Sequence, residues 1–148
     1  FFPYGYDERQ YCSPGFNLPM GCFMRTPHGQ YSEYHTSADN LDFVQPQYLS
    51  ESLTQCLSVL HAIEHNKTYR NQNPKCEPQL GRRGLYRAIA GQQEGNQGEL
   101  ALLWVLNLSD GAHTLLDIAA RSGLRFALIK TAADALHASG LLRESCMT

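Results

Sequence analysis

The sequence predicts a mixed α/β chain that ends in a small winged helix-turn-helix module. Residues 1–47 are rich in Gly, Pro and Tyr, and their short apolar runs are bounded by turn residues. Such a pattern is typical of loops with one or two strands. A helical period of apolar residues starts at Pro46, and three more helical segments followed by a short strand occupy the end of the chain.

In the first half, the run from Leu18 to Met24 predicts an extended piece, and residues 26–29 (Thr-Pro-His-Gly) predict a turn. The helix that starts near Pro46 should end near Asn66. Its apolar stripe consists of Tyr48, Leu49, Leu53, Cys56, Leu57, Leu60 and Ile63.

Residues 67–84 are polar and contain Pro and Gly, so we expect a loop or an extended connection there. Residues 92–98 are also polar and contain glycine, which is typical of a linker. The expected organisation is therefore a first domain over residues 1–91, a linker over 92–98 and a terminal domain over 99–148.

The terminal domain is predicted from its helix signals. An apolar helix spans the region of Leu100 to Leu106 and is broken by Ser-Asp-Gly at 109–111. Thr114 is a plausible N-cap for a second helix, and Gly123 stands where a left-handed residue would end it.

A third helix is expected over residues 125–139, because its apolar positions recur every three or four residues. Gly140 ends it before the short run 141–143, which predicts a strand. Three helices, the last two joined by a glycine turn, followed by a short strand outline a winged helix-turn-helix.

Composition limits the function classes. The chain has 148 residues, 43% of them hydrophobic, with net charge −2 and a pI near 6.3, which gives no overall basic footprint for nucleic acid or an anionic membrane. Its five cysteines are odd in number and form no C-x-x-C pair, which favours a reduced, cytoplasmic protein. The chain does not begin with Met, so we expect it to be the C-terminal part of a longer protein.

The segment from Glu33 to Asn40 carries the densest potential chemistry. It places His35 beside the phenol of Tyr34 and near the carboxylate of Asp39. Imidazole is a common zinc ligand, and a ligating histidine usually donates its second ring N–H to a neighbouring acceptor. Zinc needs at least three protein ligands, however, and this segment offers one firm candidate. The alternative is a structural loop histidine.

Five motifs in order resemble the end of bacterial aminopeptidase-like proteins of the co-catalytic zinc peptidase superfamily, which are often associated with polysaccharide biosynthesis and end in a winged helix-turn-helix. The resemblance covers nearly the whole chain. The motifs are DERQ at 7–10, SPGFNLP at 13–19, MRTP at 24–27, YHTSADNL at 34–41 and PQLGRRGLY at 78–86.

The resemblance implies the end of a zinc-aminopeptidase-like α/β domain joined to the terminal module. It implies zinc as cofactor and hydrolysis of a peptide or amide bond in an intact protein. By this resemblance His35 is a metal ligand, and Tyr34 is the catalytic residue that stabilises the oxyanion. Asp39 is a carboxylate that hydrogen-bonds a metal ligand. The resemblance also assigns substrate binding to Asp7, Glu8 and Arg9. The remaining ligands and the general base of the family would precede residue 1.

A rival metal motif is His61-Ala-Ile-Glu64-His65, which formally fits H-x-x-E-H. Matches of this length arise easily by chance, and no third ligand is indicated, so a solvated helix end is the favoured interpretation.

The expected substrate is a peptide or an amide small molecule. The expected protein partner is the upstream part of the same protein, and a homo-oligomer is a further option. No membrane partner is expected.

DNA binding is disfavoured. Residues 99–148 carry four basic residues against five acidic ones, whereas a DNA reader normally presents a basic face. The alternative function is therefore a non-catalytic module that binds protein or, less favoured, DNA.

Overall fold

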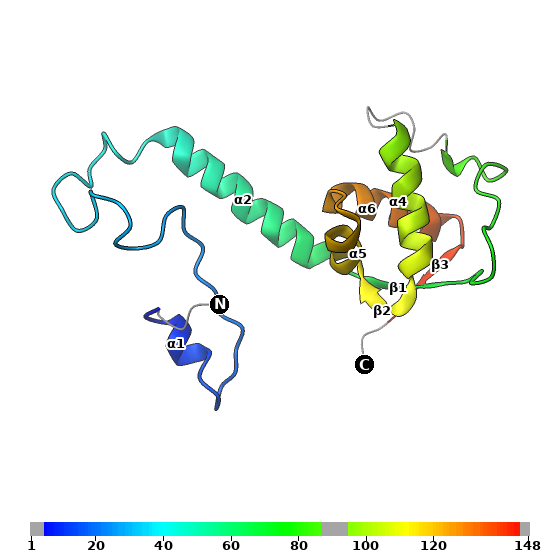
Figure 1. Cartoon of the computed structure of the whole chain (residues 1–148), viewed down its shortest axis with the longest axis horizontal. Helices are drawn as coiled ribbons and strands as arrows, with labels where there is room; N and C mark the ends of the chain where they lie inside the picture. Colours follow the sequence, from blue (N-terminus) through cyan, green and yellow to red (C-terminus); the bar gives the residue numbers. More distant parts are fainter. Residues whose placement is uncertain (1–4, 87–94, 146–148) are drawn as a thin grey trace. The chain divides into compact units, whose positions relative to one another are not determined.

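The computed structural model describes residues 5–86 and 95–145, and the chain divides into two compact units, residues 1–55 and 56–148 (Figure 1). Helices and a three-stranded sheet are both present, which confirms the mixed α/β prediction. Each unit is described by itself below.

The first unit contains α1 (Glu8–Tyr11) and the first half of α2 (Pro46–His65), joined by turns. None of its described residues is buried. The prediction of one or two strands in residues 1–47 is wrong for the described part, because residues 5–45, including the run from Leu18 to Met24, contain no strand. Strand backbone groups need a neighbouring strand as partner. Here the Leu18 N–H donates to the Tyr11 carbonyl at 3.0 Å and the Met20 N–H donates to the Leu18 carbonyl at 2.8 Å, so local turns use the backbone groups instead.

Helix α2 confirms the helix predicted from Pro46 to about Asn66. Proline at the first helical position loses no hydrogen bond, since that N–H would have no intrahelical acceptor. The helix ends at His65. None of its residues is buried, although its apolar stripe repeats over the full length.

The second unit is built on an antiparallel sheet in the order β2-β1-β3 (Figure 1). Its strands are β1 (Thr68–Asn71), β2 (Asp110–Thr114) and β3 (Leu142–Glu144). Strand β1 pairs with β2 through Thr68 and Thr114, and with β3 through Tyr69 and Glu144. The predicted final strand is thus confirmed, shifted by one residue.

Strand β1 refines the prediction of a loop or an extended connection over residues 67–84, because Thr68–Asn71 is extended and paired in the sheet. Thr68 and Tyr69 are buried, and their partners lie more than forty residues later in the sequence. A four-residue strand is too short to show an alternating pattern, so the pairing partners decide its structure. Leu80 from the same polar stretch and Leu85 directly after it are also buried.

Three helices pack beside this sheet: α4 (Gly95–Leu108), α5 (Leu115–Ser122) and α6 (Phe126–Ala138). The predicted N-cap and glycine stop are confirmed. The Thr114 hydroxyl accepts the Asp117 N–H, the Asp117 carboxylate accepts the Thr114 N–H, and Gly123 is left-handed with φ 70°. Gly140 likewise has φ 74°, a region that a side chain would make costly.

One hydrophobic core joins the sheet to the helices, and it includes residues well before position 92. The predicted linker over 92–98 falls partly on residues 92–94, which lie outside the described residues, and partly on the first turn of α4. The fully buried large side chains of the core are Leu80, Leu102, Val105, Leu115, Ile118, Ile129 and Leu136.

Candidate functional site

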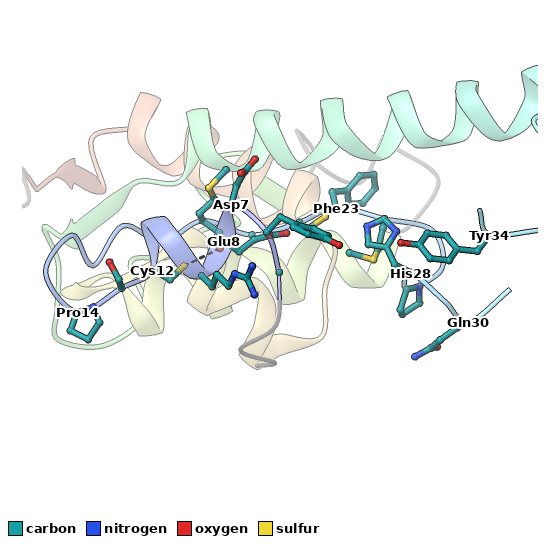
Figure 2. A pocket seen from close by; sticks show the side chains of 17 residues that line it. Asp7, Glu8, Cys12, Pro14, Phe23, His28, Gln30 and Tyr34 are labelled. Carbon is teal, nitrogen blue, oxygen red and sulfur yellow. Dashed lines mark hydrogen bonds between the residues drawn. The ribbon is translucent and has the colours of Figure 1, made fainter. Parts of the chain in front are cut away.

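A hollow in the first unit collects most of the predicted site residues (Figure 2). Four of them line it: Asp7, Glu8, Arg9 and Tyr34. They come from α1 and from a loop about 25 residues later, so the fold of this unit brings separate motifs to one surface. His35 and Asp39 are not among its lining residues.

Helix α1 presents the acidic side of the hollow. Asp7 stands at its N-cap, and its carboxylate makes no capping hydrogen bond. Glu8 accepts hydrogen bonds from its own backbone N–H and from the Cys22 thiol, and these hold the pKa of Glu8 below its ordinary value. The same hydrogen bond raises the pKa of Cys22. The raised pKa keeps the Cys22 thiol protonated near neutral pH, so it is not a reactive thiolate.

The far end of the hollow is aromatic. The phenol of Tyr34 extends toward the His28 ring (Figure 2), and the two ring centroids are 5.6 Å apart. Tyr31 packs edge-on against Tyr34 at 5.5 Å and stacks on Phe43 at 5.7 Å. These contacts hold the half-buried Tyr34 ring in one orientation.

Sequence reasoning missed two members of this surface. No role is predicted for Cys22 from the sequence, and His28 falls in the predicted turn at residues 26–29. No local pattern links Cys22 to Glu8 or His28 to Tyr34, because each pair is separated by several residues of irregular backbone. The Cys12 thiol instead donates to the Met20 carbonyl at 3.3 Å.

His35 is held in an unusual backbone conformation. Its φ is 58°, in the left-handed region that non-glycine residues rarely adopt, and its exposed ring stacks on Tyr34 at 4.1 Å. Such strain is common at functional sites and needs surrounding contacts to persist.

The contacts that fix this loop come from its hydroxyl and amide side chains. The Thr36 hydroxyl donates to the Glu33 carbonyl at 2.8 Å and accepts the Ala38 N–H at 3.2 Å. The Asn40 side chain accepts the Asp42 N–H at 2.8 Å. Asp39 is exposed, and no described hydrogen bond or ion pair joins its carboxylate to His35, so its predicted role stays a prediction.

The donor atoms around His35 do not by themselves make a zinc site. Within residues 5–86 and 95–145, no three His, Cys, Asp or Glu side chains gather at metal-binding separation. Structural and catalytic zinc sites use at least three protein ligands. His35 can supply one imidazole, and any further ligands must come from elsewhere.

The rival histidine pair lies on the last turns of α2. The rings of His61 and His65 are 4.2 Å apart, and His65 Nδ1 donates to the His61 carbonyl at 2.9 Å. The geometry is that of a hydrogen-bonded helix end. In the part of the chain that the structure describes, Glu64 does not complete a three-ligand cluster with them.

A family profile described as a winged helix-turn-helix matches residues 67–144, the region that contains the whole sheet and all three terminal helices. The chain belongs to this winged helix-turn-helix family. A second profile, described as a domain of unknown function, matches residues 1–66. The winged-helix match thus begins next to β1, which agrees with the pairing of that strand.

Two relatives of this winged helix-turn-helix chain come from Clostridium acetobutylicum. A protein named "Putative polysaccharide biosynthesis protein with aminopeptidase-like domain" is 54% identical over 143 residues, which are 97% of this chain and 33% of that protein. A crystal structure described as a "putative peptidase" has 50% identity and a TM-score of 0.83, covering 98% of this chain and 31% of that one. The chain thus spans about a third of these relatives, and the predicted resemblance to the C-terminal part of aminopeptidase-like proteins is confirmed.

Two lysines of the winged helix-turn-helix are paired with carboxylates. Lys130 on α6 pairs with Asp134 at 2.6 Å, and Lys67 pairs with Glu144 at 2.8 Å. Phosphate contacts made by these two lysines would have to displace these pairs. Among the described residues, no helix is long and apolar enough to span a membrane.

Proposed function

We propose that this chain is the C-terminal part of a zinc-dependent aminopeptidase-like hydrolase, in which the hollow of the first unit forms part of the substrate site. The hydrolysed bond is a peptide or amide bond, and hydrolysis requires the metal ligands that precede this chain. The observation that carries the proposal is the convergence of Asp7, Glu8, Arg9 and Tyr34 on one surface. The names of the two relatives support the same class of reaction.

The lining residues suit a substrate with charged ends. The carboxylates of Asp7 and Glu8 attract an ammonium group, and the depressed pKa of Glu8 keeps it ionised at neutral pH. The Arg9 guanidinium attracts a carboxylate. The presence of both signs on one short helix favours a small peptide-like molecule over a polyanion.

In this proposal Tyr34 donates a hydrogen bond to the carbonyl oxygen of the bond that is cleaved. A donor aimed at the developing oxyanion stabilises the transition state more than the ground state. The aromatic contacts of Tyr34 with Tyr31 and His28 pre-orient the ring. His35 contributes one metal ligand from the adjacent position. Because the residues described here do not complete a metal site, no step is assigned to the metal in this chain.

The test uses the protein expressed from its complete coding sequence. Zinc content is measured by mass spectrometry, and hydrolysis is measured with aminoacyl nitroanilides. Tyr34→Phe should keep the metal and lower kcat by about 10²-fold, because it removes one hydrogen-bond donor. His35→Ala should lower metal content and activity together.

Matched controls separate these effects from general damage. Tyr11→Phe removes a phenol from the same unit outside the hollow, and His65→Ala removes an imidazole from the end of α2. Both controls should retain metal and activity. If Tyr34→Phe and His35→Ala behave like their controls, the assigned roles are wrong.

We propose a cytoplasmic setting, because the described cysteines, Cys12, Cys22, Cys56 and Cys76, are free.

A second candidate function is a non-catalytic module that binds protein. The pairing of Lys130 with Asp134 on α6 favours protein over DNA as its partner. Duplex binding that weakens steeply with salt would contradict that preference.

A further inference from the structure

Helix α2 exposes a continuous apolar surface, here called the α2 apolar face. Its residues are Leu49, Leu53, Cys56, Leu57, Leu60 and Ile63. Leu49 and Leu53 are each 60% exposed, and Ile63 is 69% exposed. A contiguous exposed apolar patch of this kind marks a surface that contacts something else in the working protein.

The shape of the face indicates what kind of surface covers it. At 100° per residue, these positions occupy about 120° of the helix circumference, the width typical of a helix packed on a globular core. The opposite side carries polar residues such as Gln47, Glu51 and Gln55. The face is therefore one-sided and wide.

A second copy of the helix is a poorer fit. A stable two-stranded coiled coil needs three or more heptads flanked by complementary charges. The α2 apolar face extends for about two heptads, and its flanking positions include Ser52 and Val59 in place of charge pairs. The apolar flanks would widen the contact beyond a coiled-coil seam.

The first unit also needs a covering surface. None of its described residues is buried, and Phe16 and Leu41 are 73% and 88% exposed. Ordering so many backbone groups without burial is unfavourable, because conformational entropy is lost without a hydrophobic gain. This unit must obtain its core from another part of a larger structure.

We propose that the α2 apolar face packs against the aminopeptidase-like part of the full-length protein, the part that corresponds to the two thirds of the relatives outside this chain. The relatives supply the length: this chain covers 33% of one and 31% of the other. The inference rests on the proposed function, since both assign this chain to a longer hydrolase. In this arrangement α2 completes the core of the preceding domain, and its neighbouring loops are held at that domain's edge.

Two cysteines provide an internal test. Cys56 lies on the α2 apolar face, whereas Cys76 follows β1 in the sequence and is not part of that face, and both are exposed and free. The 148-residue chain and the protein from the complete coding sequence are labelled with maleimide, and peptide mass spectrometry gives the rate at each thiol. In the isolated chain, the two thiols should react at comparable rates. In the full-length protein, Cys56 should react at least about tenfold more slowly than Cys76, because burial permits labelling only during local opening.

Other outcomes overturn the proposal. Equal rates in the full-length protein would mean that the face stays open. Protection of Cys56 in the isolated chain that grows with concentration would identify a second copy as the occupant. A complete coding sequence that adds nothing to this chain would remove the proposed partner.

A pair of charge insertions provides an independent check. Leu53→Lys places a charge on the α2 apolar face, and Gln55→Lys places the same charge on its polar side. In the full-length protein, only Leu53→Lys should restore the labelling of Cys56. If both variants leave Cys56 protected, the protection of Cys56 does not come from a contact made through the α2 apolar face. An inactive protein with Cys56 protected would refute the hydrolase and keep the interface, whereas an active protein with Cys56 open would refute the interface alone.

Discussion

Substitution of Thr114 by alanine should destabilise the second unit through the loss of one capping box. The Thr114 hydroxyl accepts the Asp117 N–H at 3.1 Å and donates to the Asp117 carboxylate at 2.7 Å. The Thr114 N–H donates to the same carboxylate at 2.8 Å, and this contact survives in the variant. The change therefore removes two hydrogen bonds and keeps one.

The expected cost follows from that count. An N-cap threonine contributes about 1 kcal/mol, and the carboxylate also loses its shortest donor, so we expect a loss of about 1 to 2 kcal/mol in the free energy of unfolding. Helix α5 has eight residues and cannot persist without tertiary support, so the loss should reach the whole second unit. For a unit of this size, that loss corresponds to a fall of about 4 to 16 °C in Tm.

Thermal and urea unfolding followed by circular dichroism measure this effect. Thr131→Ala is the matched control, because its hydroxyl donates within α6 to the Ala127 carbonyl at 2.9 Å and caps nothing. It should change stability by less than about 0.5 kcal/mol, since alanine is the better helix former. If both variants unfold at the wild-type midpoint, the capping box does not stabilise α5.

Two further predictions concern the same unit. Leu136→Ala should lower the free energy of unfolding by about 2 to 5 kcal/mol, because the Leu136 side chain is fully buried. Leu116 is 48% exposed, so Leu116→Ala should lower it by less than about 0.5 kcal/mol in the same urea experiment. Equal losses in the two variants would contradict the assigned core. Hydrogen bonds led by that from the Ala112 N–H lower the pKa of Asp110 from 3.8 to about 2, so its contribution is complete above pH 4 and is lost as pH falls toward 2. The stability difference between wild type and Asp110→Asn should therefore change as pH falls from 4 toward 2.5, and a difference that stays constant over that range would refute the linkage.

Local signals predicted α2, α5 and α6 well, whereas α1 was not predicted and the first turn of α4 was predicted as linker. Thr114 and Gly123 marked the ends of α5 because a hydroxyl cap and a left-handed glycine act within one turn of the backbone. The 3.6-residue period placed α2 and α6 for a similar reason, since a helix makes its own hydrogen bonds.

The sheet and the hollow could not be predicted in this way. Strand β1 depends on partners near residues 114 and 144, and its sequence, Thr-Tyr-Arg-Asn, carries too few apolar residues to indicate burial. The one or two strands predicted in residues 1–47 failed for the converse reason, because apolar runs such as Leu18 to Met24 have no neighbouring strand in the described part of the first unit. Candidate site residues were found by motif, but their roles stay predictions.

The sequence by itself therefore determined the terminal helices with their caps, the amphipathic character of α2, and the resemblance that relates Tyr34 and His35 to a metal site. Only the tertiary structure decided that β1 is the central strand, that Cys22 lines the same hollow as Glu8, and that the residues of α1 share a surface with Tyr34. The physical reason is the separation in sequence between the residues that make each contact. Helix and cap contacts join residues within four positions, whereas strand pairing and the assembly of the hollow join residues that only the folded chain brings together.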